Sequence, residues 1–245
     1  MTNENGSLGL LSKSRRVFAG QAMLAAACGT AGWLRFGGSP SVSAGWSSPV
    51  DVATPDTPQQ ALELLYEGNR RFASGEPRDS RRDMERVREV ASSQRPFAAF
   101  LGCADSRVPI EIIFNQGFGD LFVTRIAGNV ASSENVGSLE FGTEVLGAKV
   151  LYVLGHTQCG AVTAAVRGTD VPGQISGLFQ HIRPAVKSAK GDVDAAIAAN
   201  VRHQAVILAE SSPVISRRIQ RGELIVAGGI YELASGRVSA VDVQL

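Results

Sequence analysis

Two short segments of the chain contain side chains that commonly bind zinc. Residues 103–107 read C-A-D-S-R, and residues 156–160 read H-T-Q-C-G. Thiolate sulfur and imidazole nitrogen are the usual protein ligands of zinc. The whole chain has only three cysteines and three histidines, so their concentration in these two segments indicates a function. We expect Cys103, His156 and Cys159 to bind one zinc ion.

The residues beside these ligands predict a catalytic site. Three protein ligands leave the fourth position of a tetrahedral zinc open, as in catalytic zinc sites. Two thiolates and a neutral imidazole leave the metal without net charge, so a bound water needs help to ionise. Asp105 can accept a hydrogen bond from that water, and Arg107 can hold Asp105 ionised through a charge-assisted pair. Together these groups predict activated water at neutral pH.

Three other interpretations of the same residues stay open. Cys103 and Cys159 could form a disulfide in an oxidising compartment, which would leave His156 without a role. Asp105 could be a fourth zinc ligand, and such a closed site would be inactive. Asp105 and Arg107 could form a structural salt bridge. His181 and His203 lie on helical patterns without nearby ligand groups and are interpreted as ordinary surface or core histidines.

The zinc-binding segments each follow an apolar run that is typical of a buried strand. Alternating strands and helices predict an α/β fold with a mostly parallel central β-sheet flanked by helices. Sites in such sheets form beyond the carboxyl ends of the strands. Residues 78–90 alternate basic and acidic side chains and predict a solvated helix or arm, of which a plain charged surface is the favoured interpretation. We expect strands near 96–101, 120–126, 149–154, 224–227 and 237–243, and helices near 57–75, 109–114, 134–146, 158–167, 174–187, 192–211 and 213–221.

The N-terminal residues have the order of an export signal. Residues 14–18 (S-R-R-V-F) form a twin-arginine pattern, an uncharged apolar stretch follows over 19–34, and small residues end it at 42–44. We expect a signal peptide over 1–44, a linker over 45–56 and a catalytic domain over 57–245, with a periplasmic location. An alternative cleavage site lies before Cys28, which would then be lipidated and would anchor the protein to a membrane. A second alternative is that the N-terminus is a cytoplasmic tail in which the arginine pair occurs by chance.

Composition and charge argue against a nucleic-acid-binding protein and against a fold held together by disulfides. The chain has 245 residues, a formal net charge of +1 and 19% charged residues. No basic patch is dense enough to suggest nucleic-acid binding. Outside the N-terminus no apolar run reaches the roughly 20 residues of a spanning helix. Three cysteines cannot form a disulfide framework, so the fold depends on its core.

From about residue 57 onward the chain resembles the β-class carbonic anhydrases. The family signature is C-x-D-S-R followed by H-x-x-C-G, and its seven fixed residues all stand at 103–107 and 156–160. The resemblance implies reversible hydration of carbon dioxide to bicarbonate and a proton. It implies zinc held by the three ligands named above and a catalytic role for Asp105 with Arg107. It also implies substrate contacts from Gln94, Phe122 and Gly160, and assembly as a homodimer or homotetramer with clefts at the interface.

One departure from the family pattern concerns regulation. Some members bind bicarbonate at a second, inhibitory site built from a tryptophan, an arginine and a tyrosine. Arg125 and Tyr231 match two of these positions, but Phe100 stands where the tryptophan would be. The loss of the indole N–H favours an open site without this inhibition, with Tyr231 as a packing residue. Hydrolysis of carbon disulfide or carbonyl sulfide on the same scaffold, and non-catalytic binding of zinc or bicarbonate, are the rival functions.

Overall fold

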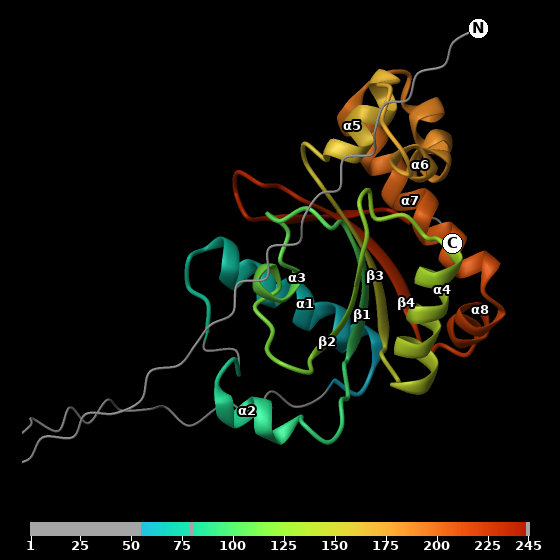
Figure 1. Cartoon of the computed structure of the whole chain (residues 1–245). Coiled ribbons are helices and arrows are strands. Elements are labelled where there is room, and N and C mark those ends of the chain that lie inside the picture. Colours follow the sequence, from blue (N-terminus) through green and yellow to red (C-terminus); the bar gives the residue numbers. More distant parts are fainter. Residues whose placement is uncertain (1–54, 79–80, 244–245) are drawn as a thin grey trace, which may run out of the picture. The chain divides into compact units, whose positions relative to one another are not determined.

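A five-stranded β-sheet forms the centre of the molecule (Figure 1). The computed structural model describes residues 55–78 and 81–243, so the predicted signal peptide, Cys28 and most of the predicted linker lie outside the described residues. The strand order is β2-β1-β3-β4-β5, and only the β4–β5 pair is antiparallel. The predicted α/β fold with a mostly parallel sheet is confirmed. The strands are β1 (Ala98–Gly102), β2 (Leu121–Arg125), β3 (Val150–His156), β4 (Ile225–Tyr231) and β5 (Val238–Val241).

The two faces of the sheet belong to two separate apolar clusters. Successive side chains of a strand point to opposite faces, so Phe100 and Tyr152 face one way while Leu101 and Val153 face the other. Helices α1 (Pro58–Ala73) and α3 (Ile110–Ile113) cover the first face. Helices α4 (Ser133–Glu140), α7 (Val193–Ser211) and α8 (Pro213–Gln220) cover the second, as Figure 1 shows.

Helix α1 begins where the sequence predicts. The Thr57 side chain accepts a hydrogen bond from the Gln60 backbone N–H, and the Gln60 side chain accepts one in return from the backbone N–H of Thr57. This capping box satisfies N–H groups that the first helical turn leaves free. Pro58 occupies the first helical position, where its fixed φ favours the helix.

Three elements differ from the predicted ones. Strand β3 continues to His156, so this residue ends a strand and does not lie in a turn. Strand β4 continues to Tyr231 through Gly228 and Gly229, which weaken the strand pattern in the sequence. A Cβ atom on Gly229 would lie 2.2 Å from the Tyr152 hydroxyl, so close packing requires glycine here. The helix predicted over 134–146 is α4 followed by a π-helical turn, η1 (Phe141–Val145).

The charged segment before the first strand has no buried residue among those described, as expected of a solvated helix or arm, but it also contacts a buried carboxylate. It contains the short helix α2 (Met84–Glu89). Arg81 and Arg86 lie 2.7 and 3.4 Å from the carboxylate of Asp120, which is 5% exposed and also accepts the N–H of Gly117. A buried carboxylate requires such partners. The segment is therefore attached to the loop that enters β2.

A third apolar cluster lies beside the predicted site. Cys103, Cys159 and Val162 pack there against Ile182 and Ile197. It joins helices α5 (Gly160–Arg167), α6 (Ile175–Ala189) and α7, which lie together at the upper end of the molecule in Figure 1. Among the residues described, no helix is both long and apolar enough to cross a membrane.

Candidate metal centre

The three predicted zinc ligands meet at the carboxyl ends of two neighbouring parallel strands. Cys103 directly follows β1, His156 ends β3, and Cys159 precedes α5. Strands β1 and β3 pair in register, with Gly102 opposite Leu154, so both chains reach the same edge of the sheet. The ligand atoms of the three residues all lie within 4.8 Å of one another. This spacing is what a single shared metal ion requires.

The histidine is oriented to offer one nitrogen to a metal. Nδ1 of His156 lies 2.9 Å from the backbone carbonyl of Thr157, which accepts the Nδ1 proton. That hydrogen bond leaves the lone pair on Nε2. Nε2 is buried and has no hydrogen-bond partner in the described part of the chain. A buried polar atom without a partner is unfavourable, and a zinc ion between the two sulfurs would satisfy it.

The two cysteines form a free thiol pair, so the structure does not contain the disulfide considered from the sequence. A hydrogen bond from the Cys159 thiol lowers the pKa of Cys103, and the N–H of Gly128 contributes in the same direction. The same hydrogen bond and burial raise the pKa of Cys159, although N–H groups of the first turn of α5 act against this rise. The pair thus holds one negative charge readily, and a divalent cation favours the second thiolate.

Asp105 and Arg107 form a two-point ion pair beside the cluster. Oδ1 and Oδ2 of Asp105 accept hydrogen bonds from Nε and Nη2 of Arg107, at 2.9 and 2.8 Å. The Arg107 backbone N–H also donates to Oδ1. These bonds from Arg107 hold the pKa of Asp105 well below its usual range. Oδ2 lies 3.8 Å from Nε2 of His156, so the ionised carboxylate borders the space between the three ligands while Arg107 occupies both of its oxygens.

Arg125 supports the same loop in a way that sequence reasoning missed. Its Nε donates to the carbonyl oxygen of Cys103 at 2.9 Å, and its Nη2 donates to that of Asp105. Arg125 ends β2 and pairs in register with Gly102. Its position at the end of a predicted strand was therefore the one feature of the sequence that could have indicated a contact with the loop after β1. From the family resemblance it was considered only for a second bicarbonate site.

The three predicted substrate residues are not brought together in one chain. Gly160 begins α5 directly after Cys159. Gln94 is exposed and precedes β1, whereas Cys103 follows that strand. Five strand residues span roughly 16 Å. Phe122 pairs with Ala99 near the start of β1, on the side away from the cysteines. Gln94 and Phe122 therefore lie at the opposite end of the sheet from the metal centre of their own chain.

Phe100 and Tyr231, at two of the three positions of the regulatory site considered above, have packing roles here. Phe100 is fully buried and contacts Phe114 and Tyr152, with ring centroids 5.0 and 5.3 Å away. Tyr231 is 6% exposed in the same apolar cluster, and burial raises the pKa of its hydroxyl.

Comparison with known proteins agrees with the geometry. Residues 98–238 match the family model described as carbonic anhydrase. The chain is 40% identical over 192 residues to carbonic anhydrase 2 of Mycobacterium tuberculosis, an alignment that covers 75% of this chain and 93% of that protein. It is 29% identical to a Coccomyxa β-carbonic anhydrase solved with acetazolamide, with a TM-score of 0.58 and coverage of 74% and 86%. Tetrameric β-carbonic anhydrases of Sordaria macrospora share the fold, with 21% identity, a TM-score of 0.61 and coverage of 74% and 96%.

The family match spans more than half of the chain and contains all three metal-binding residues, together with Asp105 and Arg107. The fold, the ligand set and these relatives agree: the chain belongs to the carbonic anhydrase family, in its β class.

Proposed function

We propose that this protein catalyses the zinc-dependent, reversible hydration of carbon dioxide to bicarbonate and a proton. The observation that carries the proposal is the meeting of Cys103, His156 and Cys159 within 4.8 Å, next to an aspartate that an arginine holds ionised. A structural zinc site needs four protein ligands. Here three ligands lie together, and the neighbouring carboxylate is engaged by Arg107.

Each residue of the site has a separate task. Zinc, when bound, supplies a Lewis acid that brings the pKa of water towards neutrality. The Asp105 carboxylate would accept a hydrogen bond from the O–H of the attacking water and would thereby direct an oxygen lone pair at the substrate. Arg107 keeps that carboxylate ionised and fixed in orientation through two parallel hydrogen bonds. Arg125 holds the backbone of the loop between Cys103 and Asp105.

The proposal is tested by stopped-flow measurement of carbon dioxide hydration on the zinc-loaded protein. We expect turnover that depends on zinc and disappears when a chelator removes it. Parallel assays with carbon disulfide and carbonyl sulfide separate the hydrolase alternative, since all three substrates need the same ligands. Zinc binding without turnover on any of the three would support a non-catalytic binding protein and contradict the proposal.

The separation of Gln94 and Phe122 from the metal centre supports a homo-oligomer. If these residues contact substrate, they must do so in the site of a second copy. Several large apolar side chains between α3 and η1 are exposed, which is typical of a surface that another chain covers. The Sordaria macrospora relatives are described as tetrameric. We therefore assign Gln94 and Phe122 to the cleft of a partner subunit, with an interface that includes Ile112, Phe118, Phe141 and Val145.

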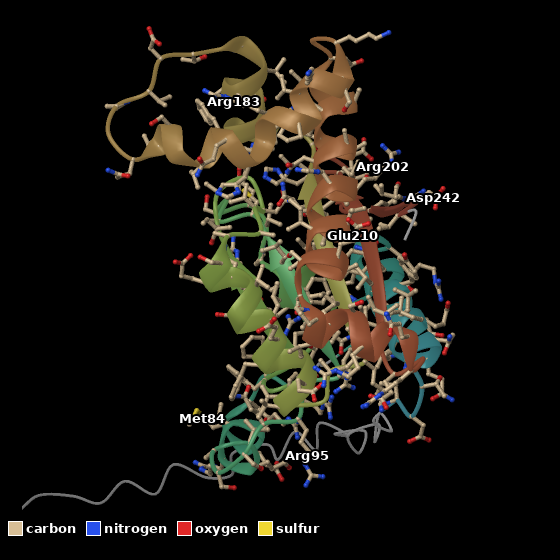
Figure 2. The ribbon with its side chains drawn as sticks, turned by 90° about the vertical axis from the view of Figure 1, so that its right-hand side faces the viewer. Met84, Arg95, Arg183, Arg202, Glu210 and Asp242 are labelled. Atoms are coloured by element: carbon tan, nitrogen blue, oxygen red, sulfur yellow. The ribbon has the colours of Figure 1, made fainter. Side chains whose placement is uncertain are left out.

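Figure 2 illustrates this separation on labelled residues. Arg95, the neighbour of Gln94, lies with Met84 at one end of the molecule, and Arg183 on α6 lies at the other end. Helix α6 packs in the same cluster as Cys103 and Cys159. In a dimer with two-fold symmetry, the end of one chain that contains Gln94 can lie against the end of the other chain that contains the metal centre.

Mixing two inactive variants tests this assignment. We expect Gln94→Ala chains alone to have little activity and Cys159→Ser chains alone to have none, and we expect activity to return after joint refolding. In a mixed dimer one site combines intact zinc ligands with an intact glutamine from the partner, so about a quarter of all sites are restored in a random mixture. Stopped-flow assays of the mixture and of each variant alone provide the comparison. Activity equal to the mean of the separate variants would place Gln94 in the site of its own chain.

We further propose export by the twin-arginine route, with a periplasmic location. The support is the order of residues 14–18, 19–34 and 42–44, since this route carries folded proteins and suits a chain that acquires its metal before export. Mass spectrometry of the mature N-terminus distinguishes cleavage after Ala44 from lipidation of Cys28.

A further inference from the structure

The loop after β2 donates a hydrogen bond to one of the metal-binding sulfurs. The backbone N–H of Gly128 lies 3.3 Å from Sγ of Cys103, and the bond is buried. Gly128 has a φ of 76°, in the left-handed region that favours glycine. A Cβ atom at this position would also lie 2.8 Å from the side chain of Ile182. The loop therefore has a particular backbone shape that directs an N–H at the ligand.

Two buried amide side chains of α7 hold this loop. Nδ2 of Asn200 donates to the carbonyl oxygen of Gly128 at 2.9 Å. Oε1 of Gln204 accepts the backbone N–H of Ala131 at 2.8 Å. The two amides are joined because Nε2 of Gln204 donates to Oδ1 of Asn200 at 3.0 Å. The same Nε2 lies 3.0 Å from the carbonyl oxygen of His181, so the pair also connects the loop to α6.

Packing alone does not account for this amide pair. Asn200 is 1% exposed and Gln204 is fully buried, on a helix whose buried face is otherwise made of alanine, valine, isoleucine and leucine. Buried polar groups are costly unless they are satisfied, and apolar residues fill such a position at lower cost. Asn200 bonds directly to Gly128, the residue whose N–H contacts Cys103, and Gln204 holds both Asn200 and Ala131 further along the same loop. Their placement points to a role in fixing this loop beside the metal centre.

We propose that Asn200 and Gln204 are positioning residues that hold the Gly128 N–H on the Cys103 sulfur and so limit how much charge this ligand donates to the metal. An N–H donor stabilises the sulfur lone pairs and makes the thiolate a weaker electron donor. Two thiolates and one neutral imidazole neutralise a zinc ion, which makes it a poor Lewis acid. The hydrogen bond offsets this by leaving more positive charge on the metal. This proposal rests on zinc binding by the three residues of the proposed function.

The test compares two buried asparagines. Asn200→Ala removes the support of the Gly128 loop. Asn69→Ala is the matched control, because Asn69 is 4% exposed and its Nδ2 also donates to backbone carbonyls, those of Ile113 and Gly236, away from the metal centre. Both proteins are loaded with cobalt(II) in place of zinc, and the sulfur-to-cobalt charge-transfer absorption is recorded. Zinc affinity is measured by competition with a chelator.

For Asn200→Ala we expect the charge-transfer band to move to longer wavelength, because the sulfur becomes a better donor. Release of the Gly128 loop also leaves Cys103 less firmly oriented, and we expect this loss to outweigh the better donor and to lower the zinc affinity on the order of ten-fold. Asn69→Ala should lower only the stability to denaturant. An unchanged band in Asn200→Ala, or the same shift in both variants, would overturn the proposal. If Asn200→Ala does not fold, Asn200→Ser is used, since its hydroxyl is too short to reach Gly128 and the same outcomes apply. The readouts need no carbon dioxide, so they stand even if hydration is not observed.

Discussion

Asp105→Ala is expected to retain zinc and to lose most of the carbon dioxide hydration activity. The three metal-binding side chains stay in place, because β1, β3 and the start of α5 position them and Asp105 is not one of the three. What disappears is the carboxylate that accepts the hydrogen bond from the attacking water. Groups that orient or accept a proton in this way contribute about 100- to 10,000-fold. Elemental analysis gives the zinc content per chain, and a stopped-flow assay of the same sample gives the turnover.

Glu63→Gln is the matched control for this experiment. Glu63 and Arg70 form another carboxylate–guanidinium pair at 2.9 Å, but on the exposed surface of α1. Exposed pairs of this kind contribute little to stability, so turnover and zinc content should both stay at the wild-type level. Wild-type turnover in Asp105→Ala would refute the role of the aspartate. Loss of zinc in that variant would show that Asp105 is itself a ligand, as in the closed site considered from the sequence.

Cys159→Ser is expected to lose zinc and, with it, all zinc-dependent turnover. The substitution replaces a thiolate with a hydroxyl that stays protonated at neutral pH, and only two good ligands remain. Cys159 is 2% exposed, so the serine hydroxyl takes the place of its sulfur and little room is left for a replacement ligand. Zinc per chain after dialysis, measured by elemental analysis, is the direct readout. The unfolding midpoint with and without chelator shows how much the metal stabilises the fold.

Thr163→Ser provides the control for Cys159→Ser. Thr163 lies in the same helix, α5, and its replacement removes one methyl group without changing a metal-binding atom. We expect full zinc content in this control. A full complement of zinc in Cys159→Ser would mean that another residue binds the metal, and the assignment of all three ligands would then be wrong.

The central elements were predictable because their patterns are local. The apolar runs before Cys103 and His156 are strands β1 and β3, and Thr57 with Pro58 begins α1 as expected. The failures have local causes as well. Glycines at 228 and 229 hid the second half of β4, where Gly229 leaves room for the Tyr152 hydroxyl. The charged segment before β1 is solvated as expected, but nothing in it reveals its contacts with the buried carboxylate of Asp120.

The sequence by itself determined the chemistry of this protein. The ligand types, the aspartate with its arginine and their order along the chain predict a zinc site that activates water, because metal preference depends on donor atoms and not on the fold. Only the tertiary structure showed which other residues hold this site in shape, and which expected substrate residues lie far from it. Arg125, Gly128 and the amides of Asn200 and Gln204 reach the centre from other strands and helices. Contacts between residues 20 to 73 positions apart leave no periodic signal in a sequence. For the same reason, only the structure placed Gln94 and Phe122 at the far end of the sheet from the metal centre, which is the basis for assigning them to the cleft of a partner subunit.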